Sequence, residues 1–483
     1  MTNYTKSTNF ATKDTLTSGD PLKIVKGTEI DTEFNNIATA VNSKADTASP
    51  TFTGTVTIPT LALSGLTASS AVATNASNAL VSVTNTGTGN NVLATSPTLV
   101  TPILGTPQSA TLTNATGLPL TTGVTGVLPE ANGGTGTTTG YYGFKNRIIN
   151  GAQIVDQRGS ASSAVTVNSV TKAYATDRFC GTGIGSSGVF TLGQVTTAPS
   201  NFINSLKATV TTADASLAAT DLYRVMHLIE GLNCVDLGWG TATAQTVTLS
   251  FWVYSNLTGT FGGSLTNSAV NRSYPFTFTI SVANTWEQKT ITVAGDTSGT
   301  WLTTSGIGIS INFGLGVGST YSGTASAWAG AEYYSATGST NVMATLSNTF
   351  YITGVQLEKG STATSFDYRP YGTELALCQR YFELISSASG YLSTLRIDCQ
   401  QRYVVQKRAA ATVSIQGTTA NLKVSNIGSD LTASGLGGQY GSNIDGTAFF
   451  ITLTSSGTTG QGAVLYVPTA SAGTVYVSAS SEL

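Results

Sequence analysis

The feature that most constrains this chain is a long stretch without charge. No Asp, Glu, Lys or Arg lies between Asp46 and Glu130, and Phe52 is the only aromatic residue there. Large side chains supply most of the burial that offsets backbone entropy, so this stretch cannot close a core around itself. Disordered tracts usually carry net charge, whereas this one keeps Val, Leu and Ile at short intervals. The pattern predicts a β-rich thread that buries its apolar residues against other copies of itself.

Composition argues against several classes of function. Only 10% of the 483 residues are charged and the net charge is −2, so nothing indicates binding to nucleic acid or to an anionic membrane. The N-terminus has no apolar signal region and no apolar run approaches the length of a membrane span, so we expect synthesis in a cytoplasm and no membrane insertion.

Metal, redox and cofactor chemistry are not expected either. The cysteines have no CxxC spacing and are predicted to be reduced core thiols; they are Cys180, Cys234, Cys378 and Cys399. The single histidine, His227, lies in an apolar run and is expected to be a hydrogen-bonded core residue. No cofactor and no metal site is predicted.

One helical pattern stands out near the N-terminus. Ile30, Phe34, Ile37 and Val41 follow the 4-3-4 spacing of a coiled-coil seam, and Thr28 is the expected N-cap. Two heptads are too short to be stable alone. The stripe belongs either to a single amphipathic helix on a small domain or to a helix that joins copies of the chain. The second reading is favoured because no nearby apolar segment could cover the stripe.

In four strings of the low-charge region the exact order of the residues is informative, and not only their composition. They are KADTASPTFTGTV at 44–56, ATSPTLVTP at 94–102, LTNATGLPL at 112–120 and VLPEANGGTG at 127–136. They resemble the shaft segments of bacteriophage tail fibres. The resemblance implies a homotrimer that attaches by its N-terminus to phage tail or adaptor proteins, with an intertwined shaft and a receptor-binding C-terminal tip. It also implies a virion tail protein that is assembled in the host cytoplasm.

Residues 141–383 have the pattern of a globular β domain. Many short apolar and alternating runs are separated by Gly, Asn and Ser, without helices between them, and Val247–Tyr254 reads as a strand buried on both faces. This pattern predicts a two-sheet sandwich of jelly-roll type. The strings NRIING at 146–151, TGVQLEKG at 353–360 and FDYRP at 366–370 resemble the carbohydrate-binding-module-like sandwich of many phage fibres.

The last segment, 384–483, is predicted to be a second β module that forms a receptor-binding tip. Several strand patterns lie before and after residues 436–446. The segment 436–446 itself is predicted to be a Gly-rich loop with polar and aromatic side chains at its tip. Together these features predict an all-β, elongated homotrimeric fibre. Its expected parts are a virion-attachment segment with a short helix at 1–45, a low-charge trimeric shaft at 46–140, the jelly roll at 141–383 and the tip at 384–483.

Sugar binding needs an aromatic face for the pyranose ring and a few planar polar groups around it. Two groups of residues could supply these, although sandwich edges and trimer seams also use aromatics. The candidates are Trp328, Tyr333 and Tyr334 in the middle domain, and Tyr391, Tyr403, Gln439, Tyr440, Asn443 and Asp445 in the last one.

The expected function is adsorption: multivalent binding of a bacterial surface glycan or outer-membrane receptor, with no catalytic residue. Three alternatives stay open. A tailspike depolymerase would need two carboxylates across a groove, and acids such as Glu332, Glu358, Asp398 and Asp445 are available without a recognisable motif. A purely structural fibre would leave receptor binding to another protein. A cell-surface adhesin is disfavoured by the lack of a signal or anchor.

Overall fold

The structure is a computed structural model, and it describes residues 3–44, 54–58, 60, 64–66, 71–83, 144–159, 161–185, 187–426, 429–468 and 475–483. The chain divides into two units, 1–115 and 116–483, which are described separately. Most of the predicted shaft, including the strings at 94–136, lies outside the described residues. No helix in the described ranges is long and apolar enough to cross a membrane.

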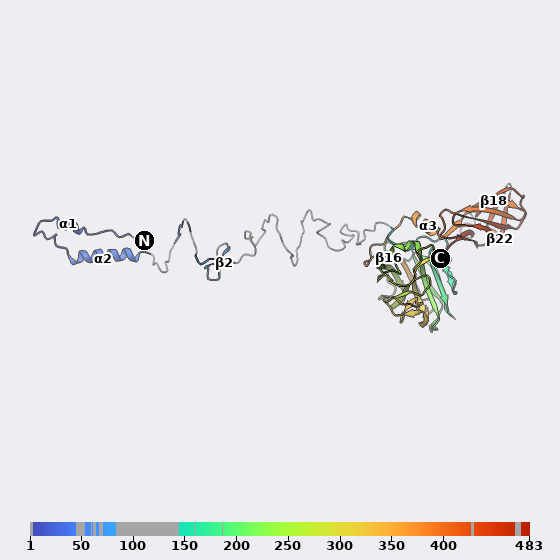
Figure 1. The fold of residues 1–483 in the computed structure, drawn as a ribbon, viewed down its shortest axis with the longest axis horizontal. Coiled ribbons are helices and arrows are strands. Elements are labelled where there is room, and N and C mark those ends of the chain that lie inside the picture. Colours follow the sequence, from blue (N-terminus) through green and yellow to red (C-terminus); the bar gives the residue numbers. More distant parts are fainter. Residues whose placement is uncertain are drawn as a thin grey trace. The chain divides into compact units, whose positions relative to one another are not determined.

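The first unit contains two helices and a hairpin, drawn in blue in Figure 1: α1 (Phe10–Asp14), α2 (Gly27–Asn42), β1 (Ala71–Thr74) and β2 (Leu80–Val83). The predicted helix is confirmed, but its predicted N-cap, Thr28, is wrong. The N-cap is Lys26, because the Glu29 carboxylate accepts the Lys26 backbone N–H at 3.0 Å and so starts the helix earlier.

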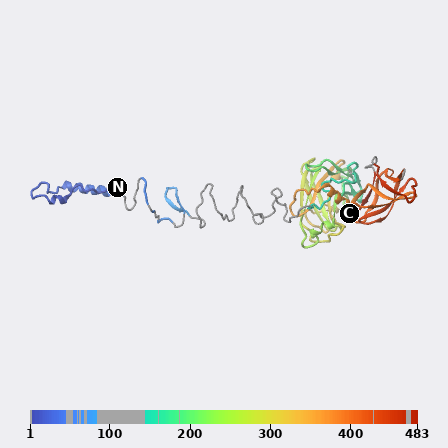
Figure 2. The ribbon, with the colours of Figure 1, turned by 90° about the horizontal axis from the view of Figure 1, so that it is seen from above.

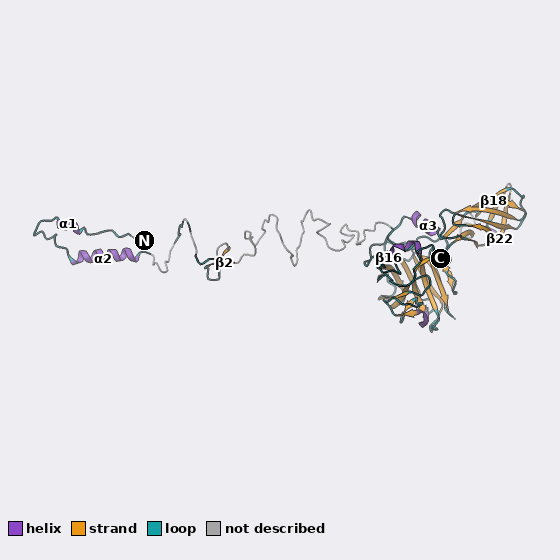
Figure 3. Cartoon of the chain, viewed as in Figure 1, coloured by secondary structure: helices purple, strands orange, loops and turns teal. Residues whose placement is uncertain are grey.

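The second unit begins with a sandwich of two six-stranded antiparallel sheets, which confirms the all-β jelly-roll fold of this domain (Figure 3). In spatial order one sheet contains β11 (Ser273–Ile280), β10 (Gly259–Thr266), β13 (Ile307–Val317), β8 (Leu222–Glu230), β5 (Phe179–Ile184) and β4 (Ala173–Tyr174). The other contains β12 (Glu287–Val293), β9 (Val247–Ser255), β16 (Thr349–Lys359), β7 (Ser205–Thr212), β6 (Val189–Val195) and β3 (Val165–Val167).

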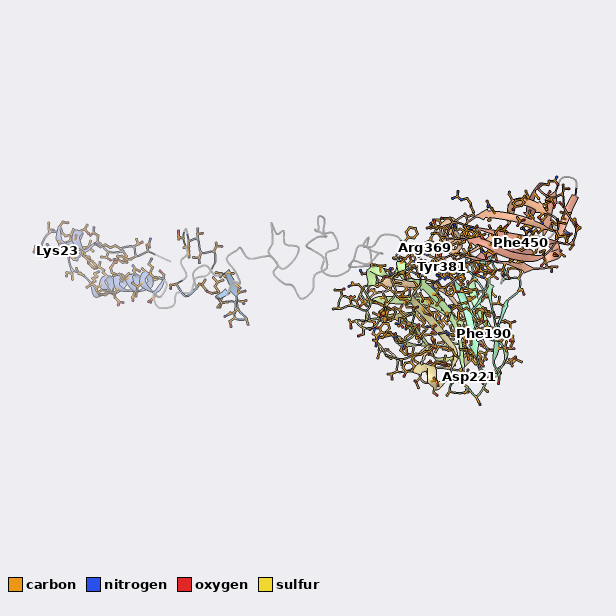
Figure 4. The ribbon with its side chains drawn as sticks, turned by 45° about the vertical axis from the view of Figure 1, so that its right-hand side comes forward. Lys23, Phe190, Asp221, Arg369, Tyr381 and Phe450 are labelled. Atoms are coloured by element: carbon orange, nitrogen blue, oxygen red, sulfur yellow. The ribbon has the colours of Figure 1, made fainter. Side chains whose placement is uncertain are left out.

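The core of the sandwich lies between these sheets and is rich in aromatic residues. Phe251 on β9 packs edge-to-face on Phe278 and Phe313 of the opposite sheet, with ring centroids 5.0 and 5.1 Å apart. Phe190, labelled in Figure 4, is buried in the same core. Thr248 and Ser250, on the other face of β9, are also buried, which confirms the prediction that this strand is covered on both faces.

A segment between β13 and β16 covers part of the sandwich. It contains the short parallel pair β14 (Ser322–Gly323) and β15 (Ser335–Ala336), and it lies over β10 and β13. Ser335 is buried, and added Cβ atoms at Gly262 and Gly314 would come within 2.3 and 2.9 Å of its hydroxyl oxygen. Glycines in the sheet thus allow the covering segment to approach closely.

Helix α3 (Tyr371–Gln379) leads from the sandwich to the last module, and buried charges join the two. The Arg178 guanidinium stacks on the ring of Tyr381 at 3.6 Å and pairs with Glu482 near the chain end. Glu230 of β8 accepts hydrogen bonds from Arg380 at 2.6 Å and from the Tyr381 hydroxyl at 2.5 Å. These contacts hold the last module against one end of the sandwich.

The last module is a closed six-stranded barrel with a small three-stranded sheet beside it. The barrel order is β18 (Ser387–Ser393), β19 (Arg396–Arg402), β23 (Gly446–Leu453), β22 (Ser429–Ser442), β21 (Lys423–Asn426) and β24 (Gly462–Tyr466). The small sheet contains β17 (Phe382–Ile385), β25 (Val475–Ser480) and β20 (Thr412–Gly417). Both appear in orange and red in Figure 2.

The prediction of a loop at 436–446 is wrong, because residues up to Ser442 belong to the long strand β22. The glycines are strand residues at three register shifts, between Ala433 and Gly441. Gly usually disfavours strands, but here it accommodates bulges and a large neighbouring ring.

The predictions for His227 and the cysteines are confirmed. His227 is fully buried on β8, its Nε2 lies 3.1 Å from the Ile149 carbonyl oxygen, and burial lowers its pKa well below the usual value. All four cysteines are buried and free. Burial raises the pKa of Cys180 and of Cys234 to about 12, so these thiols stay protonated.

Candidate functional site

The outer face of the barrel carries a row of side chains across three neighbouring strands. Alternation along β19 and β23 sends Ile397, Cys399 and Phe449 into the core and the residues between them outward. In the register, Tyr391 of β18 lies opposite Asp398 of β19, and Asp398 lies opposite Phe450 of β23. The row therefore places a tyrosine, a carboxylate and a phenylalanine side by side on the outer surface.

The ring of Phe450 lies against the glycines of β22. A Cβ at Gly437 would lie 2.0 Å from a ring carbon of Phe450, and one at Gly438 would lie 2.9 Å away. Tyr440 stacks on the same ring with a centroid distance of 5.9 Å and an interplanar angle of 26°. The Arg396 guanidinium lies 4.8 Å from its centroid. Phe450, Tyr440 and the two glycines form what we call the aromatic platform, and Figure 4 labels Phe450 on it.

Asp398 fixes the platform to the rest of the row. Its side chain is 4% exposed, and its carboxylate accepts a hydrogen bond from the Tyr440 hydroxyl at 2.7 Å and one from Arg396 Nε at 3.1 Å. Desolvation and this hydrogen bond raise the pKa of Tyr440 to about 12, so the phenol stays a donor at neutral pH. Tyr440 nevertheless remains 57% exposed, as does Tyr391.

Next to the platform lies a hollow of about 1190 Å³. Its floor crosses four strands, where Ser389 pairs with Gln400, Gln400 with Ala448, and Ala448 with Gly441, so that all of the floor residues except Gln400 are small. Its walls are lined by Tyr391 and Asp398 on β18 and β19, by Gln401 and Arg402 at the end of β19, and by the turn between β22 and β23. Small floor residues between larger walls explain why this face of the barrel is concave.

The turn between β22 and β23 supplies two predicted site residues. The Asn443 side-chain oxygen accepts the backbone N–H groups of Asp445 and Gly446 at 2.8 and 2.9 Å, so Asn443 shapes the turn. Asp445 is exposed and accepts a hydrogen bond from Gln406 at 3.1 Å. Both residues line the hollow together with Tyr391.

Two other predicted residues of this module have internal roles. Tyr403 is 9% exposed and packs into the barrel core. The Gln439 side chain donates to the Ala411 carbonyl at 2.7 Å and accepts the Val413 N–H at 3.1 Å, which ties β22 to the segment entering β20. Neither residue lines the hollow.

The structure places the three predicted residues of the sandwich in its covering segment. Trp328 packs edge-to-face on Trp239, Trp301 and Tyr274, with centroids 5.1 to 5.5 Å apart, and its indole N–H donates to the Ala294 carbonyl at 2.8 Å. Its surroundings are those of a packing residue.

The two tyrosines of this segment are also engaged. Tyr334 is 6% exposed, lies under the Arg224 guanidinium at 3.7 Å and donates to Glu332 at 2.5 Å. Tyr333 packs so closely on Gly323 that a Cβ there would lie 2.2 Å from its ring. The structure thus brings Tyr391, Tyr440, Asn443 and Asp445 together on the barrel and keeps Trp328, Tyr333 and Tyr334 apart from them.

Sequence reasoning missed several residues of the hollow and the platform. Phe450, Arg396, Gln400 and Arg402 were not candidates. A signal was present, because the alternation Ala448–Phe449–Phe450–Ile451 leaves one aromatic residue on the outer face of a half-buried strand. The pairing of that strand with a glycine run could not be read from one sequence.

The residues around the hollow can bind a ligand through hydrogen bonds from polar side chains and through stacking on aromatic rings. Three side chains at the hollow make no hydrogen bond or ion pair within the part of the chain that the structure describes: Gln400, Tyr391 and the exposed Arg402. Their polar groups are therefore free for a ligand. Among the described residues no cluster of three or more His, Cys, Asp or Glu could hold a metal ion.

Comparisons with known proteins give only distant likenesses. No family model and no curated protein matches the chain. Among solved structures, the enzymatically active domain of tailspike protein 4 of bacteriophage CBA120 is 13% identical at a TM-score of 0.22, over 45% of this chain and 22% of that one. This chain therefore spans about a fifth of that tailspike domain.

Two carbohydrate-binding modules are similar at the same level. The family 11 module of a cellulosomal cellulase of Clostridium thermocellum is 12% identical at a TM-score of 0.22, over 41% of this chain and 99% of the module. A CBM61 module in complex with β-1,4-galactotriose is 9% identical at a TM-score of 0.21, over 44% and 99%.

Proposed function

We propose that the hollow and the aromatic platform of the barrel bind a bacterial surface glycan. The observation that carries the proposal is the concave, polar hollow of about 1190 Å³ beside the exposed rings of Tyr391 and Tyr440. A pyranose ring stacks its C–H face on an aromatic ring, and its hydroxyl groups exchange hydrogen bonds with planar polar side chains. Gln400 and Arg402 supply such groups on the hollow's wall and floor.

Within this proposal the chain is a homotrimeric tail fibre of a bacteriophage. Its N-terminal segment attaches to tail or adaptor proteins of the virion, its low-charge region forms the shaft, and its barrel is the receptor-binding tip. The shaft strings at 44–136 support this role. Weak single sites suit such a fibre, because several copies held together raise the effective concentration of each site and so the strength of attachment.

The first test compares cell binding by the full chain and by matched variants. Tyr391→Ala together with Tyr440→Ala removes both exposed rings, whereas Tyr476→Ala removes a half-buried tyrosine of the small sheet that does not line the hollow. We expect the double variant to lose binding to bacterial cells or to their purified surface polysaccharide, and the control to keep it. Equal binding by all three proteins would refute the proposal.

A second candidate function is hydrolysis of the glycan, favoured by one observation: Asp398 and Asp445 both line the hollow. Asp398 lies opposite Phe450, and the Tyr403 backbone N–H donates to the Asp445 carbonyl, so the two acids are about five residues apart along the strands, or ~16 Å at ~3.3 Å per residue. Glycosidase carboxyl groups lie ~5 to 9.5 Å apart. Asp398 is also held by Tyr440 and Arg396, so binding fits better. Release of reducing oligosaccharide in the same cell assay would favour hydrolysis.

A further inference from the structure

The turn at 443–446, which forms one wall of the hollow, lies against a neighbouring segment of the chain. This segment, residues 403–407, belongs to no helix or strand, and we call it the support segment. Two of its backbone N–H groups donate to carbonyl oxygens of the turn: Tyr403 to Asp445 at 3.0 Å, and Lys407 to Ile444 at 2.8 Å. Asn443 sets the shape of the turn, whereas these two bonds set where the turn lies.

A buried ion pair holds the support segment in place. The side chain of Lys407 has no exposed surface, and its ammonium lies 2.6 Å from the Glu383 carboxylate of β17. The ammonium also donates to the carbonyl oxygen of Gln379, the last residue of α3, and lies 4.8 Å from the centroid of the Tyr403 ring. The Glu383 carboxylate accepts the Val404 backbone N–H at 3.1 Å. The support segment is therefore attached to α3 and to the small sheet beside the barrel.

A pair of this kind contributes little net stability, so its presence calls for another reason. Removing an ammonium and a carboxylate from water costs about as much free energy as their attraction returns, and an apolar pair of similar volume is often as stable. Burial lowers the pKa of Lys407, although the hydrogen bond with Glu383 opposes this shift. Three contacts that converge on one ammonium do, however, restrict where the support segment can lie.

The support segment continues into the joint between the barrel and the sandwich. The next residue, Arg408, donates from its guanidinium to the Ser305 carbonyl oxygen of the sandwich at 3.2 Å. Its backbone N–H donates to the carbonyl oxygen of Arg380, which follows α3, at 3.2 Å. The wall of the hollow is thus placed relative to α3, and not only by the strands of the barrel.

From these contacts we infer that Lys407 is a positioning residue of the glycan site, which holds the turn at 443–446 where Asp445 reaches a sugar bound in the hollow. The inference rests on the proposed function and deepens it. Lys407 cannot contact the glycan itself, because its side chain is buried and its ammonium is already bound on three sides. Its influence must pass through the support segment to the exposed Asp445.

The first test is a double-mutant cycle on the affinity of the full chain for the purified surface polysaccharide. Lys407→Met removes the ammonium and keeps a long side chain, and Asp445→Ala removes the carboxylate of the wall. We expect Lys407→Met alone to weaken binding about fivefold, as for the loss of one hydrogen bond, and to have no further effect once Asp445→Ala is present. Combined with Tyr440→Ala the effect stays about fivefold, because Asp398 and Phe450 hold Tyr440.

Unchanged affinity in Lys407→Met, or the same loss with and without Asp445→Ala, would overturn the inference.

Two further variants distinguish positioning from a loss of folding. Lys407→Met together with Glu383→Gln removes both charges, and a glutamine at position 383 can still accept the Val404 N–H. We expect this variant to melt close to the unmodified chain and to show the same loss of affinity. Lys423→Met is the matched control, since Lys423 contacts Thr432 in the same barrel and does not line the hollow. Full affinity in the double variant, or an equal loss in Lys423→Met, would contradict the inference.

Amide hydrogen exchange separates this inference from the proposed function, because it needs no glycan. In Lys407→Met we expect faster exchange at the amides of positions 403 and 407, which donate to the turn, and unchanged exchange in β18 and β19. Faster exchange in a chain that binds no polysaccharide would refute the proposed function and still support the placement of the wall. Unchanged exchange at both amides would overturn the inference whatever the binding result.

Discussion

The sandwich and the barrel use aromatic residues in opposite ways. In the sandwich, Trp328 and Tyr334 lie in contact with other rings, guanidinium groups and backbone carbonyls, and Tyr334 is 6% exposed. In the barrel, Tyr391 and Tyr440 leave 57% of their surface exposed beside a hollow. The backbone beside the rings differs as well: a covering segment lies over the sandwich, whereas the Phe450 ring, on which Tyr440 stacks, lies against glycines of β22.

The largest effect that tests this contrast is on stability. Tyr334→Ala removes a buried ring that supports Arg224, and loss of a buried aromatic side chain costs ~3 to 5 kcal/mol of unfolding free energy. Denaturant unfolding followed by tryptophan fluorescence measures it, since every tryptophan lies in the sandwich sequence. Tyr334→Phe keeps the ring and should cost less. Unchanged stability in Tyr334→Ala would mean that this tyrosine is not a packing residue.

The next effect is on affinity in the barrel. Tyr391→Ala with Tyr440→Ala removes two stacking faces, each contributing ~1 kcal/mol, so glycan affinity should fall at least about tenfold. Tryptophan emission should stay constant during glycan titration of the unmodified chain, because the barrel has no tryptophan. A glycan-dependent change in tryptophan emission would instead indicate binding in the sandwich.

A single methyl group tests the role of the glycines. Gly437→Ala places a Cβ 2.0 Å from a carbon of the Phe450 ring, so the ring must leave its place, whereas Gly435→Ala meets only Thr452 Oγ1 at 3.5 Å. We expect Gly437→Ala to lower glycan affinity by roughly fivefold, about 1 kcal/mol, and Gly435→Ala to leave it unchanged. Equal effects in calorimetric titrations would show that the platform is not part of the site.

A pH dependence of stability is expected from Asp177 in the sandwich. Burial raises the pKa of Asp177 from 3.8 to about 6, so its contribution to stability is fully present below about pH 4 and is lost as the pH rises through about 6. The melting temperature of the unmodified chain relative to Asp177→Asn should therefore increase as the pH falls from 7 to 4. A constant difference would mean that Asp177 titrates normally.

The sequence predicted the sandwich well because its signals are local. Val247–Tyr254 is apolar on alternate positions and carries aromatics between them, and this pattern requires two covered faces whatever the topology. The helix at Gly27–Asn42 was predicted for the same reason, from the spacing of four side chains.

The site was predicted only in part because it depends on pairing between distant strands. The glycine-rich stretch at 436–446 predicts a loop with Tyr440 and Asp445 among its polar and aromatic residues. Asp398 and Phe450 meet Tyr440 only through the register of β19, β23 and β22. The residues beside Gln439 and Tyr403 in the sequence do not show that these two side chains make internal contacts, while Tyr391 and Tyr440 are exposed.

The most direct test of the barrel site is hydroxyl-radical footprinting of the full chain with and without a saturating surface glycan. Mass spectrometry then gives the oxidation of each aromatic side chain. We expect protection of Tyr391, Tyr440 and Phe450, with no change at Trp328 or Tyr333. Protection of Trp328 and Tyr333 with unchanged oxidation of the barrel residues would contradict the assignment and move the receptor site to the sandwich.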